Sequence, residues 1–156
     1  MLATRRSLKE RLVDDALGEL LPSAELPYLL AESDFVVLAV PLTGETRQLI
    51  GEAELRTMKS TAVLINIARG AIVDQDALVQ ALKDGVIAGA GLDVFEQEPL
   101  AEESELWGME TVIMSPHISG GTEIYNQRAV GILCDNLRRY LAEEPLLNLA
   151  DPKRGY

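Results

Sequence analysis

The chain has 156 residues, and its 14 Lys and Arg against 25 Asp and Glu give a formal net charge of −11 at pH 7. Hydrophobic residues make up 47% and charged residues 25%, which is the composition of a globular protein and excludes a disordered one. The length predicts one domain with a single core. The acidic balance, without basic stripes, argues against general affinity for nucleic acid or an anionic membrane.

The cysteine and histidine content excludes two further classes of framework. One cysteine, Cys134, cannot form an intrachain disulfide, and one histidine, His117, leaves no ligand cluster for a structural zinc site, so no metal is expected. The longest apolar run, residues 35–42, is far shorter than the ~20 residues that cross a bilayer, and the N-terminus lacks the layout of a signal peptide. We therefore expect a cytoplasmic protein.

Short apolar runs alternate with segments of helical period, which is typical of βα units that build a parallel sheet. Residues 2–4 resemble the end of a strand and lead into Arg5-Arg6-Ser7 and an expected helix over residues 8–13. Because the chain begins partway through this alternation of strands and helices, we expect a first strand and helix to be missing. Ser23 is expected to cap a short helix that ends near Ala31.

The rest of the chain predicts an α/β fold. Strands are expected at the clearest apolar runs, which are residues 35–40, 62–67, 88–94 and 111–114, each apolar on both faces. Helices are expected over residues 52–58 and over residues 74–85, where an acidic cap opens the helix and a glycine ends it. The longest helix is expected over residues 122–141, with a continuous apolar stripe, and Pro145 prevents its continuation.

Three of these strands are followed by residues that can carry chemistry. Arg69, Glu98 and His117 follow the second, third and fourth of them. Ligands of open α/β sheets bind at the carboxyl ends of the strands. A guanidinium can hold a carboxylate through two parallel hydrogen bonds, and an imidazole beside a carboxylate is a plausible general acid near neutral pH. The alternatives are a surface arginine paired with a nearby acid and a structural histidine.

Three segments then carry a specific resemblance. They are VLAVPLTGETRQLI (residues 37–50), LINIARGAIVDQDALVQALKDGVIAGAGLDVFEQEPL (64–100) and SPHISGGT (115–122). The chain resembles the D-isomer-specific 2-hydroxyacid dehydrogenases, near the glyoxylate/hydroxypyruvate reductases. The resemblance extends over nearly the whole chain, as far as its closing NLADPKRGY. The resemblance implies a partial Rossmann-like, doubly wound parallel sheet without its first strand and helix, and with a long C-terminal helix. Residues 1–156 would form an incomplete dinucleotide-binding domain, including the C-terminal segment that in the family returns to the substrate domain.

The resemblance also implies roles for particular residues. Arg69 matches the arginine that binds the substrate carboxylate and carbonyl oxygen, His117 matches the catalytic histidine, and Glu98 matches the carboxylate that pairs with it. Asp93 matches the aspartate that hydrogen-bonds the nicotinamide carboxamide. Further positions that match the cofactor site are Pro41, Thr46, Ile67, Ala68 and Gly120.

The cofactor preference is predicted from Arg5, Arg6 and Ser7. In a dinucleotide fold an acid near this place binds the ribose hydroxyls of NAD, whereas arginine suits the 2′-phosphate of NADP. Two guanidiniums and a hydroxyl therefore favour NADP over NAD. The alternative is a pair of solvated arginines at the start of a helix.

One element of the family pattern is absent. Gly89-Ala90-Gly91 runs along a predicted strand and is not the glycine fingerprint that places a pyrophosphate on a helix N-terminus. We expect hydride transfer between NAD(P)H and a small 2-oxo acid in a longer protein, with the isolated chain inactive. The isolated chain should also be marginally stable or self-associate, for example as a homodimer. The alternative is a non-catalytic α/β remnant or interaction module of the same family.

Overall fold

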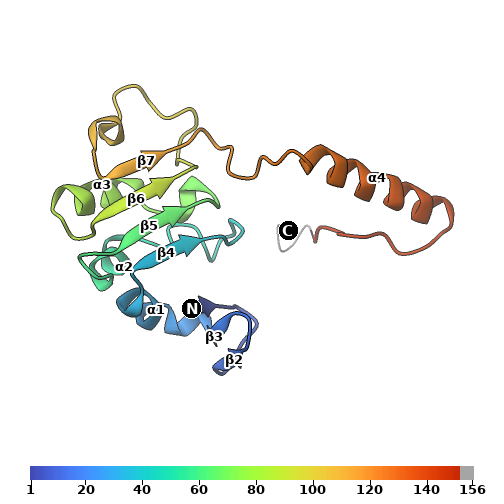
Figure 1. Cartoon of the computed structure of the whole chain (residues 1–156), viewed down its shortest axis with the longest axis horizontal. Helices are drawn as coiled ribbons and strands as arrows, with labels where there is room; N and C mark the ends of the chain where they lie inside the picture. The colour runs from blue at the N-terminus through green and yellow to red at the C-terminus, as the bar shows by residue number, and fades with distance from the viewer. Residues whose placement is uncertain (152–156) are drawn as a thin grey trace. The chain divides into compact units, whose positions relative to one another are not determined.

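The computed structural model describes residues 1–151, which fall into two compact units, Met1–Pro116 and His117 onward, each described by itself. The first unit contains a parallel sheet in the order β4-β5-β6-β7 (Figure 1). Its strands are β4 (Phe35–Leu38), β5 (Val63–Asn66), β6 (Gly89–Leu92) and β7 (Val112–Met114). The predicted α/β class and all four predicted strands are confirmed, each strand being shorter than its apolar run.

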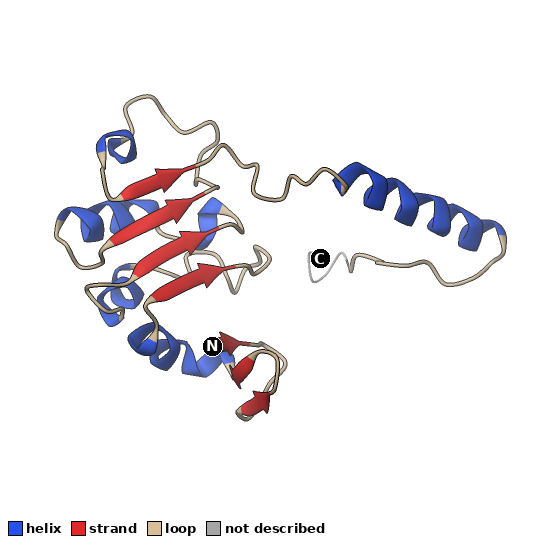
Figure 2. Cartoon of the chain, viewed as in Figure 1, coloured by secondary structure: helices blue, strands red, loops and turns tan. Residues whose placement is uncertain are grey.

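Helices connect the strands of this unit (Figure 2). They are α1 (Leu26–Glu32), α2 (Glu52–Thr57) and α3 (Gln75–Lys83), with 3-10 turns η1 (Ser23–Glu25), η2 (Gly70–Ile72) and η3 (Glu105–Gly108). The predicted limits of α3 are confirmed. Its cap is Asp74, whose Oδ1 accepts a hydrogen bond from the amide of Ala77 at 3.0 Å, and Gly85 follows the helix with φ +65°.

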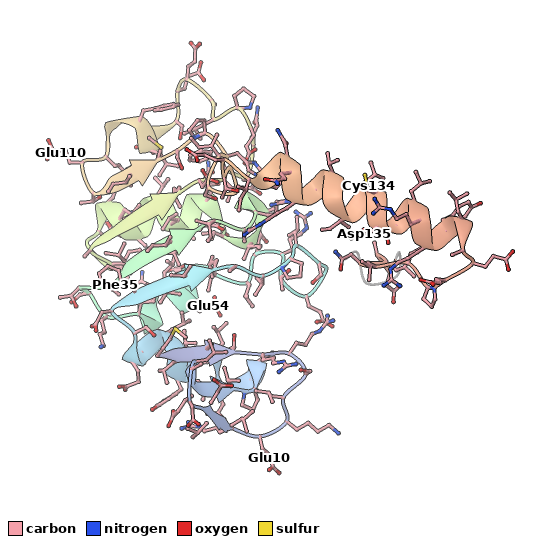
Figure 3. All side chains as sticks on the ribbon, turned by 45° about the vertical axis from the view of Figure 1, so that its right-hand side comes forward. Glu10, Phe35, Glu54, Glu110, Cys134 and Asp135 are labelled. Carbon is pink, nitrogen blue, oxygen red and sulfur yellow. The ribbon has the colours of Figure 1, made fainter. Side chains whose placement is uncertain are left out.

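The core lies on one face of the sheet. Leu64 of β5 and Leu92 of β6 are buried together with Leu55 of α2 and Leu78 of α3. On the other face, Phe35 and Val37 of β4 are 66% and 54% exposed, and Figure 3 shows Phe35 at the start of that strand. The strands are thus apolar on both faces, as the sequence predicts, but β4 is buried on one face only.

A second, smaller sheet precedes the first and corrects one prediction. It consists of β1 (Leu2–Thr4), β2 (Leu12–Asp14) and β3 (Gly18–Leu21), with β3 parallel to β1 and antiparallel to β2. The helix predicted over residues 8–13 is therefore wrong. Asp14 Oδ1 accepts hydrogen bonds from the amides of Ala16 and Leu17, both at 2.9 Å, and this turn reverses the chain so that β2 pairs with β3.

Ionic contacts hold β2 near the following helix. The Arg11 guanidinium donates to Glu25 Oε2 from Nε at 2.7 Å and lies 4.5 Å from the ring centroid of Tyr28. The hydrogen bond to Glu25 raises the pKa of Arg11 above its ordinary value.

The predicted cap at Ser23 is also wrong. Ser23 is the first residue of η1, whose N-cap is Pro22, and no side chain caps this turn. The α-helix that follows has Glu25 as its N-cap and a proline in its first turn. Proline is favoured there because its fixed φ suits a helix and its missing amide would have had no partner. The first turn is thus set by proline geometry and not by a hydroxyl cap.

The second unit consists mainly of α4 (Tyr125–Leu141), which begins three residues after the predicted start at Thr122. The segment after the helix folds back along it, because the Asn136 side chain accepts from the Leu147 amide at 2.7 Å and donates to its carbonyl at 3.1 Å. The apolar side chains of α4 are exposed within this unit. The last five residues of the closing NLADPKRGY lie outside the described residues. Within residues 1–151, no helix is both long and apolar enough to cross a membrane.

Candidate active site

The turn after β5 places Arg69 at the carboxyl end of the sheet. Asn66, the last residue of the strand, is only 1% exposed. Its Nδ2 donates to the carbonyl of Arg69 at 3.0 Å, and its Oδ1 accepts from the amide of Ala68 at 3.0 Å. Both polar groups of the buried amide are thus used to fold the turn, which leaves the Arg69 side chain exposed. Arg69 Nη1 donates to the carbonyl of Ala68 at 2.6 Å.

A glycine brings this turn against the loop after β6. A Cβ built on Gly70 would lie 1.9 Å from both C and O of Phe95 and 2.4 Å from the nitrogen of Glu96. Only a residue without a side chain permits this approach of the two backbones. In the same loop Glu98 Oε1 accepts from the amide of Phe95 at 3.0 Å. The turn that carries Arg69 and the loop that carries Glu98 are therefore in direct contact.

Hydrogen bonds also join the ends of β5, β6 and β7. Asp93, which follows β6, is 4% exposed, and its amide donates to the carbonyl of Asn66 at 3.0 Å. Its Oδ1 accepts from the hydroxyl of Ser115, which follows β7, at 2.5 Å. The Asp93 carboxyl group is thus held in a buried place at the edge where Arg69 and Glu98 lie.

The turn after β4 forms another part of this edge. Thr46 Oγ1 donates to the carbonyl of Pro41 at 2.7 Å and accepts from the amide of Thr43 at 2.8 Å. The Thr46 hydroxyl therefore holds the turn itself. Glu45 in this turn forms an ion pair with Arg6, 3.4 Å between Oε2 and Nη1. The structure thus brings Arg6, predicted from the start of the chain, next to the turn that contains Thr46.

The remaining predicted residues are exposed. Arg5 and Ser7 flank Arg6 after β1, and the Arg5 amide donates to the carbonyl of Leu21 at 2.9 Å. His117 and Gly120 belong to the second unit. His117 has φ +56°, the left-handed region, which few residues other than glycine adopt and which recurs at functional sites.

Three residues of this edge were not among those predicted from the sequence. Asn66 could have been found as the polar residue that ends an apolar strand, and Gly70 as the glycine after the arginine. Ser115 carries no comparable signal, because its contact with Asp93 depends on the register between β6 and β7.

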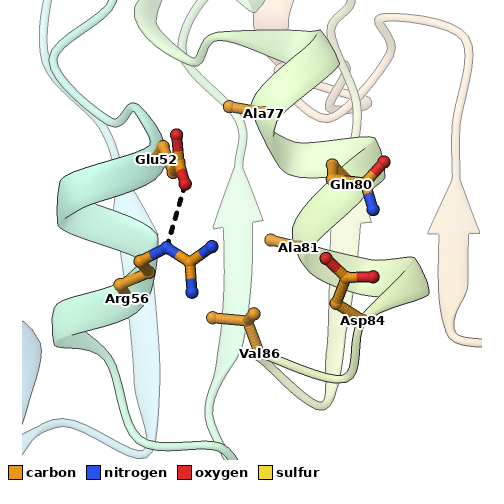
Figure 4. A pocket seen from close by; sticks show the side chains of 7 residues that line it. All are labelled: Glu52, Arg56, Ala77, Gln80, Ala81, Asp84 and Val86. Atoms are coloured by element: carbon orange, nitrogen blue, oxygen red, sulfur yellow. Dashed lines mark hydrogen bonds and ion pairs between the residues drawn. The ribbon is translucent and has the colours of Figure 1, made fainter.

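A pocket of about 120 Å³ lies between α2 and α3 (Figure 4). Its polar rim includes the ion pair of Arg56 and Glu52, with 3.0 Å between Nε and Oε1. The residues that line it are Glu52, Arg56, Ala77, Gln80, Ala81, Asp84 and Val86. None of the predicted site residues is among them.

A parallel sheet with Arg69, Asp93 and Glu98 after its strands is that of an α/β domain that binds ligands at the carboxyl edge. Comparison with known proteins gives the family. Residues 2–119 match the model of the D-isomer specific 2-hydroxyacid dehydrogenase, NAD binding domain. The chain belongs to this family, and the resemblance noted in its sequence is confirmed.

Individual relatives agree with this assignment. The chain is 56% identical over 117 residues to a glyoxylate reductase of Thermococcus gammatolerans, which covers 75% of this chain and 34% of the relative. A D-isomer specific 2-hydroxyacid dehydrogenase from Xanthobacter autotrophicus Py2, solved with NADPH and MES, has a TM-score of 0.89 and 40% identity, over 99% of this chain and 62% of that one. The NADPH-dependent glyoxylate/hydroxypyruvate reductase from Sinorhizobium meliloti, solved with NADP and sulfate, has a TM-score of 0.89 and 29% identity, over 99% of this chain and 49% of that one. The chain thus spans about a third of the length of the curated relatives it matches.

Proposed function

We propose that the chain forms the carboxylate-binding and proton-transfer part of a reductase that converts small 2-oxo acids, such as glyoxylate or hydroxypyruvate, to 2-hydroxy acids of D configuration. The observation that carries the proposal is the contact of Gly70 with the backbone of Phe95 and Glu96. This contact holds an exposed guanidinium and an exposed carboxylate on adjoining loops at the edge where α/β sheets bind their ligands. The names of the relatives supply the substrate class.

The proposed roles follow from the chemistry of three side chains. Arg69 binds the carboxylate of the 2-oxo acid through its planar fork of donors and polarises the carbonyl oxygen. Protonated His117 donates a proton to that oxygen as the carbonyl carbon is reduced, and Glu98 is the carboxylate that orients the imidazole. A positioned acid of this kind contributes roughly 10²–10⁴-fold to the rate. In the reverse direction the imidazole accepts the hydroxyl proton.

The residues present fit the two ends of a nicotinamide dinucleotide. At one end the buried carboxylate of Asp93 can accept a hydrogen bond from the carboxamide, and at the other Arg5 and Arg6 supply cations for a 2′-phosphate, which favours NADP over NAD. When bound, the reduced cofactor supplies the hydride. Residues 89–91 lie in β6, so they do not form the cradle of a pyrophosphate.

The proposal is tested by placing the chain in an active context. In a chimaera the chain replaces the matching segment of the Thermococcus gammatolerans reductase, and reduction of glyoxylate by NADPH is followed at 340 nm. We expect His117→Ala to lower kcat by about 10²–10⁴-fold. Arg69→Lys should raise KM and lower kcat together, because an ammonium keeps the charge and loses the fork. The control is Arg56→Ala, an exposed arginine in the pocket between α2 and α3. Near-normal turnover of the His117 variant would remove the proton-donor role.

The isolated chain separates this proposal from its alternative. We expect the 156 residues alone to show no turnover, because their sequence contains no glycine fingerprint for the pyrophosphate. If the chimaera is equally inactive while folded, the chain is better described as a non-catalytic remnant or interaction module.

The free thiol of the exposed Cys134 suits a reducing compartment, which supports a cytoplasmic location.

A further inference from the structure

We propose that Ser115 is a positioning residue that fixes the Asp93 carboxylate for the nicotinamide end of the cofactor, an inference that rests on the proposed function. The hydroxyl of Ser115 donates to Asp93 Oδ1 at 2.5 Å. Asp93 is 4% exposed, so protein donors must replace most of the water that would otherwise solvate its charge. The Ser115 hydroxyl supplies one of these donors.

The backbone hydrogen bonds of Asp93 and Ser115 do not determine the direction of the Asp93 carboxylate. The amide of Asp93 donates to the carbonyl of Asn66, and the amide of Ser115 donates to the carbonyl of Leu92, both at 3.0 Å. These ladder bonds fix where the two residues lie in the sheet. They do not fix the side-chain torsions of Asp93, which the hydroxyl of Ser115 restricts by holding one oxygen.

Ser115 also stands two residues before His117 in the chain. The segment that follows β7 and leads to the proposed proton donor therefore also supplies the hydroxyl that sets the proposed cofactor carboxylate. A change at Ser115 should consequently affect the nicotinamide end of the cofactor and leave the adenine end unchanged. This distinction separates positioning from a general contribution to folding.

The experiment uses the full 156-residue chain and two ligands, titrated by calorimetry. One is NADPH, and the other is 2′-phospho-ADP-ribose, which has the same adenine end but no nicotinamide. We expect Ser115→Ala to weaken NADPH binding about threefold to tenfold, as for loss of one hydrogen bond that supports a charged group, and to leave the second ligand unchanged. Ser115→Thr, which keeps the hydroxyl, should restore the affinity for NADPH.

The Ser115→Ala substitution is also made in an Asp93→Asn variant, as a control. In that variant Ser115→Ala should produce no further loss of NADPH affinity, because the carboxylate that it positions is gone. Equal losses for the two ligands would show a structural role, and no loss for NADPH would show that the hydroxyl positions nothing; either result overturns the inference. The same titrations are made with the chimaera, because the sequence of the chain has no glycine fingerprint for the pyrophosphate. Failure of the unsubstituted chimaera to bind NADPH overturns the proposed cofactor role and this inference with it, whereas the two former results leave the cofactor role intact.

Discussion

The close approach at Gly70 gives a prediction whose size can be worked from the geometry. In Gly70→Ala the new methyl carbon would lie 1.9 Å from C and O of Phe95. Ordinary carbon contacts are about 3.5 Å, so the two loops must separate by roughly 1.5 Å. Overpacking in a core costs about 1–3 kcal/mol, and we expect about 3 kcal/mol because the obstructing atoms are backbone and cannot rotate away. For a chain of this length that corresponds to a Tm lower by about 6–12 °C.

The control is Gly108→Ala, because a Cβ at Gly108 meets no heavy atom within 4 Å. Thermal unfolding of the two variants and the unsubstituted chain is followed by far-UV circular dichroism, and urea unfolding provides a second estimate of the same free energy. The control should unfold close to the unsubstituted chain. If Gly70→Ala unfolds within about 2 °C of the control, the two loops are not in close contact, and the contact that carries the proposed function is refuted.

Four other changes test separate parts of the structure. Arg5→Asp should weaken NADPH binding by about tenfold or more and leave NADH binding unchanged or improved, with a smaller effect at high salt; equal losses would mean that Arg5 does not contact the phosphate. Glu45→Gln should tighten NADPH binding and leave NADH unchanged in calorimetric titrations at low salt, because Arg6 loses its competing partner; weaker NADPH binding would contradict this. Asp74→Ala should destabilise the chain by about 1 kcal/mol in urea through loss of the α3 cap, more than Asp76→Ala in the same helix, and equal effects would argue against the cap. Phe35→Ser should reduce self-association in size-exclusion chromatography at several concentrations, because Phe35 is a large apolar group exposed on β4, and an unchanged monomer in both proteins would contradict the expected association.

The parts of the fold that depend on local signals were predicted from the sequence. Helix α3 was found because Asp74 and Gly85 act within their own segment, through a cap and a left-handed residue. The helix predicted over residues 8–13 was wrong because the pairing of β2 with β3 outweighs a weak helical period. The sequence did contain a signal for a hairpin here, namely an aspartate and a glycine at the two ends of a short turn, Asp14 and Gly18. In the structure the Asp14 side chain accepts hydrogen bonds in this turn, and Gly18 has φ +82°.

In the candidate site, too, only the features set by local sequence patterns could be predicted. That Arg69 and Glu98 follow neighbouring parallel strands could be predicted, because such strands end at one edge of the sheet. The atoms that fix them could not. The contact of Gly70 with Phe95 and the hydrogen bond from Ser115 to Asp93 depend on the register and twist of the sheet, which local patterns do not specify.

The strand order of the larger sheet has a consequence for synthesis of the protein. Because β4, β5, β6 and β7 are neighbours in the order in which they are translated, each new strand leaves the ribosome next to an edge that is already formed. Growth then proceeds in one direction, and every strand pairs with its immediate predecessor without a wait for distant sequence. The turn with Arg69 is made before the loop with Glu98 exists, and Ser115 arrives after both. A nascent chain stalled before β7 would already contain the guanidinium and the carboxylates of this edge, with Asp93 still lacking its serine hydroxyl.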